Sequence, residues 1–399
     1  MIKVLIVADW YLPAYKAGGP VRSLSNLVAT MTNAGFEFCV LTRDRDLSDV
    51  APYSNVVLDT WIKVGNAKVL YTSDSSMRNF RRRINEIKPE IIYLNSFFSA
   101  LARKVLLLRR LRMIAPCAVI VAPRGELSPG ALSLKARKKK FYLKLAALSG
   151  LYRGVLWHAT APLEKLEIAG ILHAHRLGQE SKSQIEDSIQ VASNIPEHIP
   201  SQQSPANRPE KQPGSAQFVF VSRVSAKKNL AMAIELLISL KGEVKFDIYG
   251  PVDDAGYWQK CEALIVCSPS NVATRYMGPV PHEQAQRKFS EYHFFLFPTL
   301  GENFGHVIAE SFGGGCPVVT SDQTPWAELE KKNIGWDLPL CDYELWRRVL
   351  QGCIDMDGTA YAAMSRDCMD FFRAWSSSSS MREESIRLFQ NAVGSGSRV

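Results

Sequence analysis

Short apolar segments alternate with helical patterns along most of this 399-residue chain. Apolar runs of about four to eight residues between turn signals are typical of buried strands. Apolar residues three and four apart are typical of helices that bury one face. Regular alternation of the two predicts an α/β protein with parallel sheets and helices on both faces. We expect strands at residues 2–8, 37–42, 68–71, 91–95, 118–122, 155–160, 218–222, 245–249, 275–277, 294–297 and 316–320.

The chain is long enough for two domains, and one segment has the composition of a linker. Residues 195–216 (IPEHIPSQQSPANRPEKQPGSA) are rich in Pro, Gln and Ser. We therefore expect a first domain at 1–196, a linker at 197–216 and a second domain at 217–380. A last helical pattern follows a serine run, within the C-terminal stretch 381–399.

The segment with the most distinctive polar content is residues 294–321, FFLFPTLGENFGHVIAESFGGGCPVVTS. It predicts a strand, a loop, a helix beginning near Phe304, and another strand. Glu302 falls in the loop, and Glu310 shares a helix face with His306. Backbone amides at residues 303–305 would form an anion site at the helix start. Two carboxylates beside a phosphate pocket suit a phosphorylated sugar.

Two other strand–helix turns carry candidate ligand groups. Gly18 and Gly19 precede a helix beginning at Pro20, and they would allow close backbone approach to a ligand. The turn is not GxGxxG, so a dinucleotide fingerprint is absent, and a plain structural turn is the alternative. Arg223 and Lys228 follow the strand at 218–222, where two cations suit a diphosphate. The alternative is that each cation simply faces water.

Further polar residues follow strands of the first domain. Arg124 begins the sequence Arg-Gly-Glu after one strand, and His158, Thr160 and Glu164 follow the next. They are candidates for ligand contacts, although ordinary helix capping explains Thr160 equally well. Neither a metal nor a cofactor is expected. The adjacent pair at 253–254 is read as a helix start.

Charge is divided unevenly between the two halves. Residues 1–196 hold 28 Lys or Arg against 15 Asp or Glu, whereas the rest holds 20 against 24. A predicted helix at 133–148 (SLKARKKKFYLKLAAL) combines lysines with apolar side chains, which suits docking on anionic lipid. A solvated helix face is the alternative, and the lack of a nucleic-acid module argues against nucleic acid. No apolar run is long enough to span a bilayer, so we expect a cytoplasmic protein.

Five stretches together resemble one enzyme family. GENFGHVIAESFGGGCPVV, with Glu302 and Glu310 spaced as E-x7-E, resembles the donor-site signature of retaining GT-B glycosyltransferases of family 4, also called glycosyl transferases group 1. VSRVSAKKN resembles their diphosphate clamp, the Gly18-Gly19 loop their N-terminal glycine loop, and YMGPV their base-binding segment. TPW at 324–326 is similar to a subgroup that assembles bacterial surface polysaccharides.

The resemblance implies two Rossmann-like domains facing a central cleft, with the helix near 381–392 crossing back to the first domain. It implies sugar transfer from a UDP- or GDP-sugar to a saccharide acceptor, lipid-linked, in lipopolysaccharide, O-antigen, capsule or exopolysaccharide synthesis. Glu302, Arg223 and Lys228 would be catalytic, without metal. The implied donor-binding residues are Gly18, Gly19, Asn303, Phe304, Gly305, Glu310, Tyr276, Met277 and Val280.

One position departs from the family pattern. Many relatives carry a His where this chain has Arg124, and an arginine stays protonated and cannot act as a general base. Arg124 and His158 are therefore expected to contact acceptor or donor. The expected location is the inner face of the cytoplasmic membrane, as a peripheral protein. The alternatives are glycoside hydrolysis, a GT-B sugar-nucleotide epimerase, and a non-catalytic nucleotide-sugar-binding partner of a membrane assembly.

Overall fold

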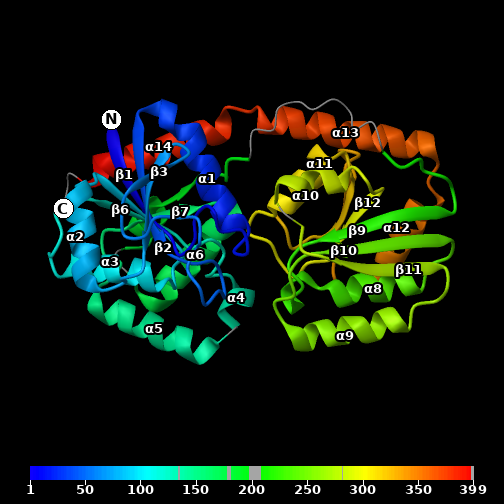
Figure 1. The fold of residues 1–399 in the computed structure, drawn as a ribbon, viewed down its shortest axis with the longest axis horizontal. Coiled ribbons are helices and arrows are strands. Elements are labelled where there is room, and N and C mark those ends of the chain that lie inside the picture. Colours follow the sequence, from blue (N-terminus) through cyan, green and yellow to red (C-terminus); the bar gives the residue numbers. More distant parts are fainter. Residues whose placement is uncertain (134, 178–180, 197–207, 281, 397–399) are drawn as a thin grey trace. The chain divides into compact units, whose positions relative to one another are not determined.

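The computed structural model describes residues 1–133, 135–177, 181–196, 208–280 and 282–396. The chain forms two compact units (Figure 1). The first consists of Met1–Glu197 together with Ser378–Val399, and the second of His198–Ser377. Part of the linker expected at 197–216, namely 197–207, lies outside the described residues.

Within the described residues, eight strands of the first unit form one sheet in the order β3-β4-β2-β1-β5-β6-β7-β8. Neighbouring strands pair in parallel, except that β3 is antiparallel to β4. The central strands are buried and apolar, as expected when helices cover both faces. The strands are β1 (Ile2–Val7), β2 (Phe36–Arg43), β3 (Ile62–Val64), β4 (Ala67–Thr72), β5 (Ile91–Asn95), β6 (Ala118–Ala122), β7 (Leu156–Ala159) and β8 (Ile189–Val191).

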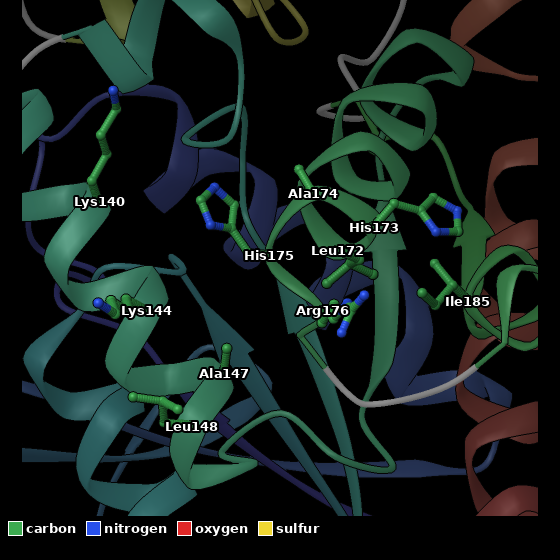
Figure 2. A pocket seen from close by; sticks show the side chains of 10 residues that line it. All are labelled: Lys140, Lys144, Ala147, Leu148, Leu172, His173, Ala174, His175, Arg176 and Ile185. Carbon is green, nitrogen blue, oxygen red and sulfur yellow. The ribbon is translucent and has the colours of Figure 1, made fainter.

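Helices connect these strands, and the C-terminal helix α14 packs on the same unit. Phe389 of α14 is fully buried and lies 5.6 Å from the ring of Phe36 and 5.3 Å from that of Tyr93. Side chains of α5 and the end of α6 line a hollow of about 980 Å³ (Figure 2). The helices are α1 (Gly19–Met31), α2 (Met77–Ile87), α3 (Ala100–Arg110), α4 (Pro129–Ser133), α5 (Ala136–Ser149), α6 (Pro162–His175), α7 (Lys182–Ser188) and α14 (Ser380–Gly396).

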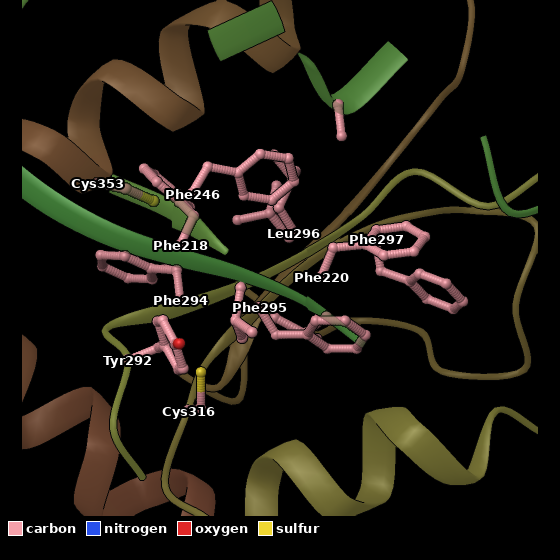
Figure 3. Close-up of a cluster of buried hydrophobic side chains, with 14 of the residues drawn as sticks. Phe218, Phe220, Phe246, Tyr292, Phe294, Phe295, Leu296, Phe297, Cys316 and Cys353 are labelled. Carbon is pink, nitrogen blue, oxygen red and sulfur yellow. The ribbon is translucent and has the colours of Figure 1, made fainter. Parts of the chain in front are cut away.

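In the second unit, six strands of the described part form a wholly parallel sheet in the order β11-β10-β9-β12-β13-β14. Its centre is an aromatic core in which Phe218 pairs in register with Phe294 and Phe220 packs on Phe297 (Figure 3). The strands are β9 (Ser215–Val221), β10 (Glu243–Tyr249), β11 (Val272–Gly278), β12 (Phe294–Phe297), β13 (Val318–Ser321) and β14 (Gly335–Leu338).

Helices cover both faces of this second sheet (Figure 1). Helix α8 contacts α9 and α12 on one face, whereas α11 contacts α10 and α13 on the other. The predicted α/β class with two parallel-sheet domains is therefore confirmed. The helices are α8 (Leu230–Ile238), α9 (Ala255–Val266), α10 (His282–Phe289), α11 (His306–Gly313), α12 (Tyr343–Asp355) and α13 (Gly358–Ser376).

Several boundaries differ from the sequence prediction. The helix expected at 133–148 begins instead at Ala136, as α5, because Lys135 before it is left-handed with φ 55°. Ser133 belongs to the shorter helix α4. The strand expected from Cys316 begins at Val318, because the Cys316 amide still donates to Ser311 and Pro317 has no amide to donate. Strands β3, β8 and β14 were not predicted. Each has only three or four residues, too few for a clear period.

None of the helices in the described ranges has both the length and the apolar character needed to cross a membrane. In each sheet the early strands are added on one side of the first strand, and the later strands are added on its other side. The reversal lies between β1 and β5 in the first sheet, and between β9 and β12 in the second. Open α/β sheets bind ligands at such a point, beyond the carboxyl ends of the strands.

Candidate functional site

An ion pair joins the turn after β9 to the loop after β12. The Lys228 ammonium donates to Glu302 Oε1, and both side chains are mostly buried, 14% and 13% exposed respectively. The Thr299 hydroxyl also contacts Glu302 Oε1 at 3.2 Å, and the Lys227 carbonyl accepts from the Leu300 amide. Because β9 and β12 are neighbours in the sheet, the two turns meet at the reversal point.

Arg223, the second predicted cation, lies in the same turn as Lys228. Its Nη1 donates to Asp253 Oδ2 at 2.9 Å, and the two side chains are 40% and 32% exposed. Asp253 follows β10, and the next residue, Asp254, caps α9 by accepting from the Tyr257 amide. The prediction that this acidic pair begins a helix is confirmed. Arg223 is thus held at the sheet edge by a partner that solvent can reach.

The loop between Glu302 and α11 has a fixed shape. Helix α11 begins at His306, two residues later than predicted, because Gly305 is left-handed with φ 77°. The Trp326 indole donates to the Phe304 carbonyl at 2.6 Å and packs on the Phe304 ring. A Cβ on Gly305 would come within 3.3 Å of Trp326 Nε1. Residues 303–305 therefore form a tight loop before the helix, where only glycine fits at position 305.

Glu310 lies on α11, in the helix that follows this loop, and is partly exposed. The far end of that helix is held firmly, since the Arg208 guanidinium donates to the carbonyls of Gly314 and Gly315 at 2.7 and 2.8 Å. The Ser365 hydroxyl also donates to the Gly315 carbonyl. Glu310 thus sits on a helix whose position is fixed at both ends.

The predicted base-binding segment lies at the end of β11. Tyr276 and Met277 are neighbouring large side chains that are 39% and 46% exposed. The Tyr276 hydroxyl donates to the Gly250 carbonyl at 2.8 Å, and its ring packs on Trp258 at 4.6 Å. Val280 is partly buried against the core. The segment therefore offers an exposed aromatic and thioether surface at the strand-end edge.

In the first unit, the glycine loop is tied to the loop after β2. Gly18 has φ 69° and caps α1. Asp46 is buried and its Oδ2 accepts from the amides of Tyr15 and Lys16 at 2.9 and 3.1 Å. These bonds fix the backbone that leads into Gly18 and Gly19.

Arg124 and His158 belong to one hydrogen-bonded chain. His158 is buried, which lowers its pKa to about 3, with the Arg124 charge as a further cause. The ring is therefore neutral. Because Nε2 lies 2.7 Å from the Ala192 carbonyl, it carries the proton, and Nδ1 accepts from the Tyr93 hydroxyl at 2.6 Å. The Tyr93 oxygen in turn accepts from Arg124 Nη2 at 2.8 Å. Both ring nitrogens of His158 are engaged inside the unit, so His158 supports Arg124 through Tyr93.

Two carboxylates hold the loop that contains Arg124. Glu164 accepts from the Gly125 amide at 2.6 Å and from the amide and hydroxyl of Thr160. The N-cap of α6 is Ala161, with no side-chain cap, so Thr160 does not cap this helix. Glu126 accepts from the amides of Phe97 and Phe98 at 2.7 and 3.0 Å, although burial raises its pKa. The loop is therefore fastened at the two residues that follow Arg124.

Sequence reasoning missed several supporting residues. Asp253, Thr299 and Trp326 touch predicted site residues, and so do Tyr93 and Asn95 in the first unit. Four of these five residues lie at or soon after the carboxyl end of a strand, whereas Tyr93 lies in the middle of β5. Over the described ranges, no three His, Cys, Asp or Glu side chains gather as metal ligands would.

Comparison with known proteins finds a family model that matches the second unit. Residues 215–340, which contain β9 to β14, match the family described as Glycosyl transferases group 1. A segment of 104 residues is 28% identical to the GtfA subunit of the UDP-N-acetylglucosamine–peptide N-acetylglucosaminyltransferase of Streptococcus agalactiae. That match covers 25% of this chain and 19% of the relative.

Three solved structures are similar over nearly the whole chain. Sucrose-phosphate synthase from Thermosynechococcus elongatus has a TM-score of 0.67 at 14% identity, covering 98% of each chain. Anabaena HepE, solved in complex with UDP and glucose, has a TM-score of 0.64 at 15% identity, covering 100% of each. WaaG, a glycosyltransferase involved in lipopolysaccharide biosynthesis, has a TM-score of 0.63 at 13% identity, covering 96% of this chain and 98% of its own. The chain therefore has the GT-B glycosyltransferase fold, and its residues 215–340 match the model of the family Glycosyl transferases group 1.

Proposed function

We propose that this protein transfers a sugar, with retention, from a UDP- or GDP-sugar to a lipid-linked saccharide during assembly of a bacterial surface polysaccharide. The observation that carries the proposal is the Lys228–Glu302 pair at the reversal point of a group 1 glycosyl transferase domain. HepE has this fold and was solved with UDP and glucose, and WaaG, of the same fold, acts in lipopolysaccharide biosynthesis. The UDP and glucose bound to HepE support a nucleotide-sugar donor, and the role of WaaG supports a glycan acceptor.

When the donor binds, its diphosphate would replace the two carboxylates that pair with the cations in the structure. Lys228 would turn from Glu302, and Arg223 from Asp253, to the phosphate oxygens. Glu302 would then accept hydrogen bonds from sugar hydroxyls, and Glu310 from the nucleotide ribose. Tyr276, Met277 and Val280 would meet the base, while residues 303–305 would contact sugar or phosphate.

The proposed chemistry needs no metal. The bond between the sugar C1 and the phosphate oxygen breaks, and a bond from C1 to the acceptor oxygen forms on the same face. The departing phosphate oxygen takes the acceptor proton. Stabilising the charge that develops on a leaving group is usually the largest catalytic contribution. Lys228 and Arg223 would supply it.

A basic, apolar face of α5 supports peripheral attachment to the cytoplasmic face of a membrane. Phe141, Leu145 and Leu148 recur on one side of the helix and are 65%, 48% and 75% exposed. Lys140 and Lys144 are exposed beside them and also border the hollow between α5 and α6 (Figure 2). Cations next to exposed apolar side chains favour anionic lipid, and a lipid-linked acceptor would be reached there.

A transfer assay tests the proposal. The purified protein is incubated with radiolabelled UDP- and GDP-sugars and with membrane extracts that contain lipid-linked saccharides. We expect label to move to the lipid fraction with one nucleotide family, without added metal and in the presence of EDTA. Release of free sugar without acceptor would indicate a hydrolase, and interconversion of the donor sugar alone would indicate an epimerase.

A further inference from the structure

Arg124 carries its charge among neutral partners. Its Nε donates to Asn95 Oδ1 at 3.2 Å, its Nη1 to Asn194 Oδ1, and its Nη2 to the Tyr93 hydroxyl. These bonds use three of the five N–H groups of a guanidinium. Among the described residues, no carboxylate forms an ion pair with it. The guanidinium is therefore in direct contact with no carboxylate of the described residues, although Glu126 and Glu164 hold the same loop.

Asn95 places a buried donor beside that charge. The side chain is 4% exposed, and its Nδ2 has no hydrogen-bond partner among the described residues. The amide cannot be turned around, because its oxygen is required to accept from Arg124 Nε and a flip would set donor against donor. Buried polar groups are nearly always bonded, so this donor points to an acceptor atom that a ligand would bring.

The place is one where a ligand would be expected. Asn95 ends β5 and Arg124 follows β6, and these strands pair in register at Asn95 and Ala122. Strand β5 flanks the reversal point of the first sheet. Arg124 is itself left-handed, with φ 57°, and its loop is fastened by Glu126 and Glu164. The donors are thus fixed before any ligand arrives.

We propose that Arg124 and Asn95 form an oxyanion subsite that holds a phosphate group of the acceptor. This inference rests on the proposed function, since it names the chemistry of the acceptor. Convergent guanidinium and amide donors suit phosphate oxygens. The first unit also has the excess of positive charge that an anionic substrate favours. The rival source of the same chemistry is the donor diphosphate, so the test must separate the two.

The test measures inorganic phosphate binding by calorimetry, with and without saturating UDP or GDP, whichever binds. Asn95→Asp is the sharpest variant, because it keeps the oxygen that accepts from Arg124 but replaces the free donor with a negative oxygen. Arg124→Gln removes the charge. Arg81→Gln, an exposed arginine on α2, is the matched control. Melting temperatures show whether each variant folds.

We expect wild type and Arg81→Gln to bind phosphate with the nucleotide already bound. Asn95→Asp and Arg124→Gln should weaken phosphate binding about tenfold or more, with nucleotide affinity changed less than about twofold. Three results would overturn the inference: phosphate binding absent from wild type, phosphate binding unchanged in a folded Asn95→Asp, or an equal loss of nucleotide binding, which would assign the subsite to the donor. Failure of wild type to bind any nucleotide would count against the proposed function instead, and the titration without nucleotide would still test the subsite.

Discussion

Lys228 and Glu302, 74 residues apart in sequence, form a mostly buried ion pair across two neighbouring strand ends. Such a pair is costly to break from one side only, because the remaining charge is left without a partner. A ligand that carries both phosphate and hydroxyl groups could replace each partner at once. We therefore interpret the two opposite charges as holding each other in position until the donor binds.

Removing Lys228 should separate catalysis from stability. We expect Lys228→Met to reduce transfer by about 100-fold or more, as loss of charge stabilisation does in other enzymes, and to lower stability as well. Adding Glu302→Gln should recover part of the stability and none of the activity, because both charges are then gone. Denaturation curves and transfer rates of the two single variants and the double variant form the cycle. Recovery of activity in the double variant would contradict the assigned roles.

For the Arg223–Asp253 pair, we expect that neutralising the acidic partner improves donor binding. Both side chains are partly exposed, so the pair is weak and competes only mildly with a donor. We expect Asp253→Asn to free Arg223 and lower the donor KM about two- to fivefold, whereas Arg223→Ala should raise it. Glu344→Gln, in an exposed ion pair with Arg347, is the control and should leave KM unchanged. Weaker donor binding by Asp253→Asn would show that Asp253 does not restrain Arg223.

Gly305 is expected to tolerate no side chain. Gly305→Ala would strain a left-handed backbone and press on Trp326 and Ile308, at 3.3 and 3.2 Å. The expected result is a loss of donor affinity in addition to a stability cost of about 1–2 kcal/mol. Gly214→Ala has a similar φ of 81° and nothing within 4 Å, so it isolates the backbone cost. If both variants bind the donor as wild type does, the shape of loop 302–305 is not needed for binding.

Buried neutral histidines predict a definite pH dependence. The pKa of His158 is about 3 in the folded protein and about 6.5 when unfolded, so below pH 6.5 the unfolded chain binds the extra proton. Stability conferred by the neutral ring is complete above pH 6.5 and is lost as pH falls toward 3, by about 1.4 kcal/mol per pH unit. His158→Gln should flatten the dependence of unfolding free energy on pH, measured by urea denaturation from pH 7 to 4.5.

His293, whose burial lowers its pKa to about 4, provides the comparison. His293→Gln should flatten the same dependence through the second unit. If the slope of unfolding free energy against pH is unchanged in His158→Gln, His158 is already charged in the folded protein. The donor and acceptor roles assigned to Arg124, Tyr93 and His158 would then be wrong.

The α5 face predicts binding to vesicles that depends on anionic lipid and weakens with salt. Replacing Phe141 and Leu148 with Ser should release the protein from such vesicles, because these exposed side chains would insert. Val266→Ser, 85% exposed on the second unit, is the control. Flotation assays measure the vesicle binding of the variant and of the control. Equal binding to neutral vesicles would contradict the electrostatic part of the proposal.

Local sequence signals were sufficient for the strands at 91–95, 118–122 and 294–297, whose observed bounds are the predicted ones. These strands are apolar, apart from Asn95 at the end of the first, and each ends at a clear change in composition. The start of α11 could not be predicted to the residue, because a bond from Trp326, twenty-two positions away from Phe304, fixes the preceding loop.

The same limit applies to partners within the site. The glutamates and cations were visible as residue types at strand ends, but their pairing depends on which strands are neighbours. Asp253 follows β10 and Arg223 follows β9, so only sheet order brings them together. Likewise, nothing local marks Asn95 as the partner of Arg124.

The most direct test of the central claim is nucleotide binding by wild type and by Lys228→Met. Binding is measured as the change in thermal unfolding on addition of UDP, GDP or dTDP. A ligand at 100 times its Kd stabilises a folded protein by about 2.7 kcal/mol, which gives a clear rise in Tm. We predict that one nucleotide raises the Tm of wild type and of Glu344→Gln but not that of Lys228→Met. No rise with any nucleotide, or the same rise in Lys228→Met, would contradict a donor site at the Lys228–Glu302 pair.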